Sequence, residues 1–113
     1  MNVRDIMRIL DAEIITGEDH LDTEVHTACG SDMMSDVLAF VKDQSVLLTG
    51  LVNPQVVRTA DMMDMRCIVF VRGKIPEQDV IDLADERGIV LLKTKLRMFT
   101  ACGLLYDNGL RGD

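Results

Sequence analysis

The apolar residues of this chain fall alternately into short continuous runs and into helical spacing, which predicts strands and helices in turn. Three apolar runs, at residues 46–48, 67–71 and 89–92, are bounded by turn residues, as is typical of strands covered on both faces. Residues 24–29 alternate loosely and predict a further strand, and residues 13–16 predict a short strand near the N-terminus.

Apolar positions three and four residues apart predict a series of amphipathic helices between these strands. The expected ranges are residues 2–11, 32–42, 53–63, 76–87 and 95–107. We expect Asn2 to cap the first helix, Asn53 to cap the third ahead of Pro54, and Thr94 to cap the last. The last helix should end at Asn108-Gly109, and residues 110–113 are expected to form a frayed tail.

Strand and helix alternate repeatedly with connections of a few residues, which requires parallel strands joined by right-handed crossovers. The sequence therefore predicts a single α/β domain over residues 1–109, built as a three-layer α/β/α sandwich with a mainly parallel sheet. The N-terminal strands are expected to add an antiparallel or mixed edge. A length of 113 residues and a hydrophobic content of 48% fit one compact domain.

The charge and the cysteines narrow the classes of function. A net charge of −7 argues against general binding to nucleic acid or to an anionic membrane. No apolar run approaches the roughly 20 residues of a membrane span, and Arg4, Asp5 and Arg8 interrupt the start where a signal peptide would be apolar. The three cysteines, Cys29, Cys67 and Cys102, are widely spaced, so the sequence predicts no cysteine metal site. We expect them to be reduced thiols of a cytoplasmic protein.

The candidate binding site lies at the predicted carboxyl ends of the strands. Ligands of open parallel sheets bind there, and helix N-termini point to the same edge. The residues expected at this edge are Gly30, Ser31, Asp32, Thr49, Gly50, Asn53, Arg72, Gly73, Lys74, Lys93 and Thr94. Arg72, Lys74 and Lys93 carry positive charge, and Lys95 follows in the same turn as Lys93. This basic group favours a small ligand that carries phosphate or carboxylate. The alternative interpretation is that the glycines shape turns, the hydroxyls cap helices and the lysines face solvent.

No catalytic or metal motif accompanies this edge. The glycine turns match neither the phosphate-binding P-loop nor the G-x-G-x-x-G fingerprint. Asp32 and Asp36 provide too few oxygen ligands for a metal, and capping of the second helix by Ser31 or Asp32 is the favoured interpretation. An enzyme with Cys29 or Cys102 as nucleophile is the least favoured alternative, because no base has a workable spacing.

The final helix is apolar around nearly its whole circumference. Such a helix is expected to be buried on two sides. We therefore predict a homodimer, since twofold dimers are the most frequent assembly, with an interface formed by Met98, Cys102, Leu104, Leu105 and Tyr106. The alternative is that a different protein covers this helix.

Several segments together resemble stand-alone proteins of the DRTGG domain family. They are residues 28–38, residues 47–50 with Asn53-Pro54-Gln55, residues 69–74 and residues 99–106. The fold of this family is similar to the N-terminal domain of HPr kinase/phosphorylase, an α/β layered sheet. The name-giving residues are absent, because Gly50-Leu51-Val52-Asn53 stands in place of Gly-Asp-Arg-Thr and Arg72-Gly73 stands in place of Gly-Gly.

This resemblance implies a non-catalytic regulatory or ligand-binding module, with no catalytic residues and no cofactor to carry over. Combined with the basic edge, it predicts a module that senses a small anionic metabolite, either a nucleotide or another phosphorylated compound. Stand-alone members also resemble accessory proteins of anaerobic redox metabolism. The alternative function is therefore an accessory or scaffold subunit of a hydrogenase-type enzyme system, with no small-molecule ligand.

Overall fold

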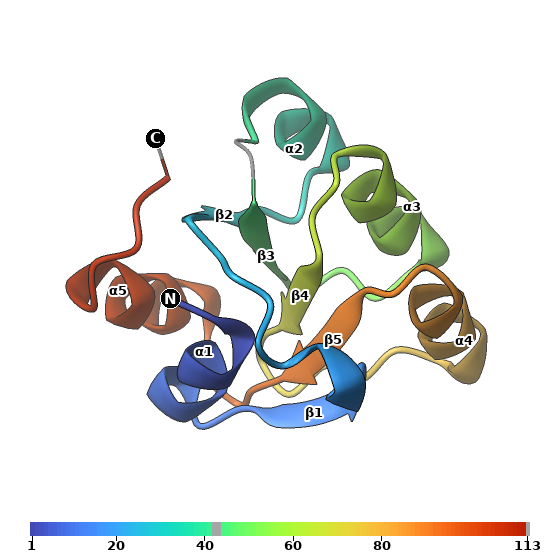
Figure 1. Cartoon of the computed structure of the whole chain (residues 1–113). Helices are drawn as coiled ribbons and strands as arrows, with labels where there is room; N and C mark the ends of the chain where they lie inside the picture. Colours follow the sequence, from blue (N-terminus) through green and yellow to red (C-terminus); the bar gives the residue numbers. More distant parts are fainter. Residues whose placement is uncertain (42–43, 113) are drawn as a thin grey trace.

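The computed structural model describes residues 1–41 and 44–112. Within them, a five-stranded mixed sheet has the strand order β1-β5-β4-β3-β2 (Figure 1). The strands are β1 (Glu13–Thr16), β2 (Thr27–Gly30), β3 (Ser45–Thr49), β4 (Cys67–Phe70) and β5 (Val90–Lys93). Strands β2 to β5 are parallel, whereas β1 pairs with β5 in the antiparallel direction. The predicted parallel sheet with an antiparallel N-terminal edge is confirmed.

The helices cover both faces of the sheet. They are α1 (Val3–Leu10), α2 (Met34–Phe40), α3 (Pro54–Met62), α4 (Gln78–Glu86) and α5 (Met98–Asp107), with a short 3-10 turn at Glu18–His20. Helices α2, α3 and α4 are the crossovers between neighbouring parallel strands, so they lie side by side on one face (Figure 1). Helices α1 and α5 pack together on the other face. The predicted three-layer α/β/α architecture is confirmed.

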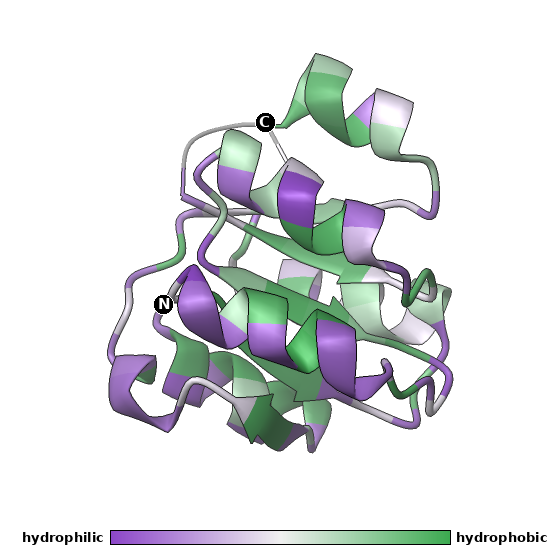
Figure 2. Ribbon diagram, turned by 90° about the vertical axis from the view of Figure 1, so that its right-hand side faces the viewer, coloured by the Kyte–Doolittle hydropathy of each residue, from purple (hydrophilic) through white to green (hydrophobic). Residues whose placement is uncertain are grey.

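The core lies on both faces of the central strands. All five residues of β3 are buried, and successive side chains point to opposite faces. Val46 and Leu48 join the apolar cluster beneath α1 and α5, whereas Leu47 joins the cluster beneath the crossover helices. Figure 2 shows the apolar residues concentrated in the strands, whereas the helices carry both hydrophilic and apolar residues.

The first helix begins where the sequence predicts. Asn2 Oδ1 accepts a hydrogen bond from the Asp5 backbone N–H, and Asp5 Oδ2 accepts one from the Asn2 backbone N–H, both at 3.0 Å. This reciprocal capping box satisfies two N–H groups that a helix start otherwise leaves unpaired. Asn53 precedes α3 as predicted, but its side chain makes no capping hydrogen bond.

Several predicted boundaries are wrong by a few residues. Strand β2 begins at Thr27 rather than at residue 24, because the Val25 N–H donates to the Met1 carbonyl instead of joining the sheet. Helix α2 begins at Met34, and its predicted end at residue 42 lies outside the described residues. Helix α5 begins at Met98 and is not capped by Thr94, whose hydroxyl donates to the Leu10 carbonyl at 2.9 Å.

The predicted frayed tail is also wrong for Leu110 and Arg111. Leu110 is 4% exposed and belongs to the core cluster beneath α1 and α5. The next residue, Arg111, forms a parallel bridge with Thr27, and its carbonyl accepts a hydrogen bond from the Ala28 N–H at 2.9 Å. The tail thus pairs part of the edge of β2, whose backbone groups would otherwise lack partners. Residue 113 lies outside the described residues.

We expect the substitution Leu110→Ala to lower the free energy of unfolding by about 2–3 kcal/mol, because it removes a buried side chain from the core. Leu38→Ala is the matched control, since Leu38 is 41% exposed on α2, and its cost should stay below about 1 kcal/mol. Urea unfolding followed by circular dichroism measures both. Equal unfolding midpoints for the two variants would mean that the tail does not contribute to the core.

Candidate functional site

The turns at the carboxyl ends of the parallel strands lie along one edge of the sheet. The register places Thr49 beside Phe70, and Phe70 in turn beside Lys93, so the turns that follow these strands are neighbours. Backbone hydrogen bonds join the last two turns, from Arg72 N–H to Leu96 O at 2.7 Å and from Gly73 N–H to Thr94 O at 2.9 Å. We call the turns at residues 30–33, 49–53, 71–75 and 93–97 the rim.

One half of the rim is closed by internal contacts around Asp32. Its Oδ1 accepts hydrogen bonds from the Gly50 N–H at 2.7 Å and from the Thr49 hydroxyl at 3.0 Å. Its Oδ2 lies 3.6 Å from Arg72 Nη1. Asp32 therefore does not cap α2 as predicted. Ser31 does not cap the helix either, because its Oγ accepts a hydrogen bond from the N–H of Met33, the N-cap residue itself, at 3.0 Å, and no side chain caps the start of α2.

The hydrogen bond from the Gly50 N–H lowers the pKa of Asp32 below its ordinary value of 3.8, with further help from the Thr49 hydroxyl and from Arg72. These contributions outweigh the opposing effect of desolvation. A Cβ atom at position 50 would collide with the Arg72 guanidinium, so glycine permits this close approach. The carboxylate and guanidinium thus compensate each other across this half of the rim.

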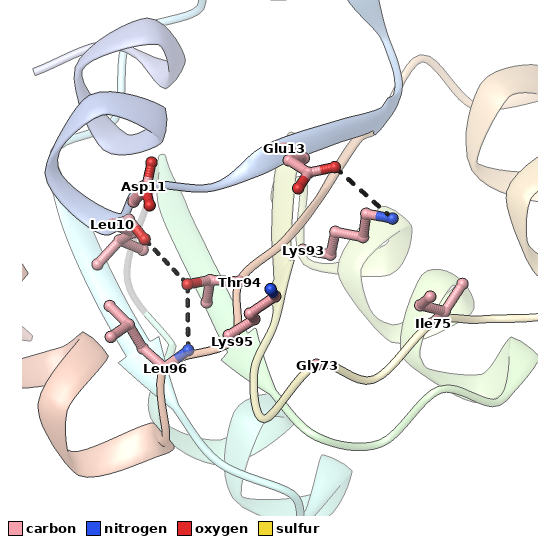
Figure 3. A pocket seen from close by; sticks show the side chains of 9 residues that line it. All are labelled: Leu10, Asp11, Glu13, Gly73, Ile75, Lys93, Thr94, Lys95 and Leu96. Atoms are coloured by element: carbon pink, nitrogen blue, oxygen red, sulfur yellow. Dashed lines mark hydrogen bonds and ion pairs between the residues drawn. The ribbon is translucent and has the colours of Figure 1, made fainter.

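The other half of the rim contains a pocket of about 290 Å³. It lies where the end of α1 and the start of β1 meet the turns after β4 and β5 (Figure 3). The lining residues are Leu10, Asp11, Glu13, Gly73, Ile75, Lys93, Thr94, Lys95 and Leu96. Below, this is called the rim pocket.

The rim pocket carries charges of both signs. Lys93 Nζ lies 3.9 Å from Glu13 Oε2, a long and partly exposed ion pair. Lys95 is exposed and forms no ion pair with any described residue. Figure 3 shows its side chain extending between Thr94 and Lys93. The rim pocket therefore offers an ammonium group that an anionic ligand can bind without breaking an existing contact.

Thr94 has a structural role in this pocket. Its side chain donates to the Leu10 carbonyl at 2.9 Å and accepts from the Leu96 N–H at 3.3 Å, and the residue is 4% exposed. The first hydrogen bond holds the end of α1 against the turn after β5, and the second lies within that turn. Thr94 therefore shapes the pocket, and the sequence-based interpretation as a helix cap missed this contact.

The structure divides the predicted site residues between the two halves. Gly73, Lys93 and Thr94 line the rim pocket, whereas Lys74 is exposed beside it and does not line it. The others, Gly30, Ser31, Asp32, Thr49, Gly50, Asn53 and Arg72, lie along the rest of the rim. Gly30 serves packing, because a Cβ there would lie 2.6 Å from Cys102 Sγ on α5.

Sequence analysis missed the acidic side of the pocket. Asp11 and Glu13 reach this edge because β1 runs antiparallel, so that the start of β1 lies beside the carboxyl end of β5. Asp11 ends α1 in the left-handed conformation, with φ at 48°. No local sequence signal marks these two residues as site residues, because their placement depends on the strand order.

The cysteine side chains are poorly suited to nucleophilic chemistry. Desolvation raises the pKa of Cys67 to about 12 and is also the main cause of the raised pKa values of Cys29 and Cys102. Such thiols remain protonated at neutral pH, whereas the thiolate is the reactive form. Among residues 1–41 and 44–112, no cluster of His, Cys, Asp and Glu side chains could hold a metal ion.

Helix α5 departs from the predicted dimer surface in one important respect. Leu105 is 1% exposed and packs inside its own chain, so it is not available to a partner. Met98, Cys102 and Leu104 are partly buried against the same cluster. The apolar surface that α5 leaves exposed consists mainly of Phe99 and Tyr106, which are 90% and 61% exposed.

We expect Asp32→Asn to lower the free energy of unfolding at neutral pH by about 1 kcal/mol, a modest value because solvent screens a partly exposed carboxylate. The pKa of the folded state lies below 3.8, so the carboxylate stabilises the folded chain above that pH. This contribution is lost as the pH falls through the lower folded-state pKa. Urea unfolding between pH 7 and pH 2 measures the free energy of unfolding of the unmodified chain and of Asp32→Asn. The difference between the two free energies should shrink as the pH falls. A difference independent of pH would refute this role.

Comparison with known proteins shows the same type of α/β fold in a solved structure. A solved structure with a similar fold is the regulatory region of Clostridium perfringens pyrophosphatase, comprising CBS and DRTGG domains in complex with the activator diadenosine tetraphosphate. The TM-score is 0.75 at 18% sequence identity, over 92% of this chain and 45% of that one. This chain therefore spans less than half of that regulatory region. A search among curated proteins found no match.

None of the helices in the described residues is both long and apolar enough to cross a membrane. The sequence model of the DRTGG domain family matches residues 5–107, which is nearly the whole chain. This match agrees with the resemblance drawn from the sequence motifs. The chain belongs to the DRTGG domain family.

Proposed function

We propose that this protein is a non-catalytic regulatory module that binds a small anionic metabolite in the rim pocket. The observation that carries the proposal is the ammonium group of Lys95, which forms no ion pair with a described residue and lies beside a pocket of about 290 Å³ at the carboxyl edge of the sheet. Carboxyl edges of parallel strands are the usual ligand sites of α/β folds. The ligand would be a nucleotide or another phosphorylated compound.

Two further observations support a ligand-sensing role. The regulatory region with a similar fold was crystallised with an activator that is itself a nucleotide compound. The rim pocket is also built on backbone hydrogen bonds between Arg72 and Leu96 and between Gly73 and Thr94, so its two turns are held together before a ligand arrives. A preformed site reduces the ordering cost of binding.

The chemistry of the site favours binding over catalysis. The Thr94 hydroxyl is occupied by two hydrogen bonds within the chain, and the cysteine thiols have raised pKa values. With three free cysteines, the chain suits a reducing compartment, and we propose that it works in the cytoplasm.

Calorimetric titration with nucleotides and sugar phosphates tests the proposal. We expect Lys95→Ala to weaken binding of any ligand found by about tenfold, the effect of losing one charged hydrogen bond. Lys74→Ala is the matched control, because Lys74 is an exposed cation on the same rim that does not line the pocket. Equal losses in both variants would indicate general charge attraction. Unchanged affinity in Lys95→Ala would place the ligand elsewhere.

We further propose that the module is a homodimer that pairs through the outer face of α5. Phe99 is 90% exposed, and Tyr106 on the same helix is 61% exposed. Aromatic side chains are common anchors of interfaces, and exposed aromatic residues on one helix favour a partner surface. The competing proposal is that a subunit of a redox enzyme covers this face.

Sedimentation velocity distinguishes these proposals. The unmodified chain should sediment as a dimer, and Phe99→Lys should sediment as a monomer while keeping its circular dichroism spectrum. Met62→Lys is the control, because Met62 is 72% exposed on α3, on the other side of the sheet. A monomeric unmodified chain, or a dimer that survives Phe99→Lys, would contradict pairing through α5 and favour a different protein as the partner.

A further inference from the structure

The charge balance of the rim pocket is unusual for a site that binds only phosphate. Its lining includes the lysines Lys93 and Lys95 but also the carboxylates Asp11 and Glu13, so the formal charges cancel. Sites that bind phosphate alone typically gather cations and backbone N–H groups. Here the adjoining helix end is the carboxyl end of α1, where the partial charge is negative.

Among the described residues, only two of these four charged groups form an ion pair with each other. Glu13 is engaged by Lys93 at 3.9 Å, whereas Lys95 has no acidic partner among the described residues. Asp11 lies at the end of α1, where its N–H donates to the carbonyls of Arg8 and Met7. Its carboxylate forms no ion pair with a described residue. The pocket thus has a cationic part around Lys95 and hydrogen-bond acceptors around Asp11 and Glu13.

Apolar side chains complete the lining. Leu96 comes from the turn after β5, and Ile75, which is 60% exposed, comes from the turn after β4, whereas Leu10 at the end of α1 is fully buried and offers no exposed surface. Such surfaces suit the face of a sugar or base ring, whereas a bare phosphate gains nothing from them.

The pocket volume limits the ligand. About 290 Å³ lies at the lower end of the range of roughly 300–1,000 Å³ found for small-molecule sites. A single nucleotide or sugar phosphate fits this size, whereas a dinucleotide with a chain of phosphates exceeds it. Each added phosphate would also approach Asp11 or Glu13, and like charges at short range destabilise a complex.

From these observations we infer that the rim pocket selects a monophosphate ester that carries hydroxyl or amino groups, such as a nucleoside monophosphate. This inference rests on the proposed function and specifies its ligand. Lys95 binds the phosphate, and Lys93 adds a second cation. Asp11 and Glu13 accept hydrogen bonds from the hydroxyl or amino groups, while Ile75 and Leu96 contact the ring.

Calorimetry with AMP, ATP, diadenosine tetraphosphate and inorganic phosphate tests the inference. We expect the unmodified chain to bind AMP about tenfold more tightly than ATP, since one unfavourable charge contact costs about this factor. The substitutions Asp11→Asn and Glu13→Gln should each weaken the binding of AMP and strengthen the binding of ATP. The ratio of the two affinities should therefore fall or reverse. Asp19→Asn is the control, because Asp19 is exposed on the 3-10 turn and does not line the pocket.

The outcomes separate this inference from the proposed function. If ATP or diadenosine tetraphosphate binds more tightly than AMP, and neither carboxylate variant changes the ratio, the selectivity is refuted while the rim pocket remains a ligand site. If AMP and inorganic phosphate bind equally, the acceptors and the apolar lining play no part and the inference fails. If no probe binds, both the proposed function and the inference are refuted.

Discussion

The fold depends on the burial of β3 and β4 on both faces. Every residue of these two strands is buried, and their side chains alternate between two apolar clusters. A strand covered on both sides needs helices above and below, which right-handed crossovers and the pair α1 and α5 supply. The strand order β2, β3, β4, β5 follows the chain, so each crossover steps in the same direction and all four carboxyl ends reach one edge. The rim is a consequence of this core.

The rim holds both a structural contact and a pocket along one edge of the sheet. Around Asp32, a carboxylate of the chain already uses the Gly50 N–H, the Thr49 hydroxyl and the Arg72 guanidinium. This arrangement ties three strands together and occupies groups that an anion would use. At the other end, β1 brings acidic residues beside Lys93 and Lys95. These two regions have similar residue types but differ in their contacts, because the cation Lys95 beside the rim pocket forms no ion pair with a described residue, whereas Arg72 lies beside Asp32.

Local sequence patterns were sufficient for the fold class but not for the contacts between distant segments. The apolar runs located β3, β4 and β5, and Asn2 located the start of α1, because burial and capping leave short-range signals. The tail at Leu110, the hydroxyl of Thr94 and the carboxylate of Asp32 were misassigned, since each bonds or packs against a partner far along the chain. Leu105 looked available for a partner because an apolar helix does not reveal which face meets the sheet.

The central claim is that an anionic metabolite binds at the rim pocket and not elsewhere on the sheet edge. Two-dimensional NMR of the labelled chain during titration with a nucleoside monophosphate tests it most directly. The account predicts changes in the amide signals of Gly73, Lys95 and Leu96, with the signals of Ser31 and Gly50 unchanged, because Asp32 already occupies that half. Changes confined to Ser31 and Gly50, or to α5, would contradict it.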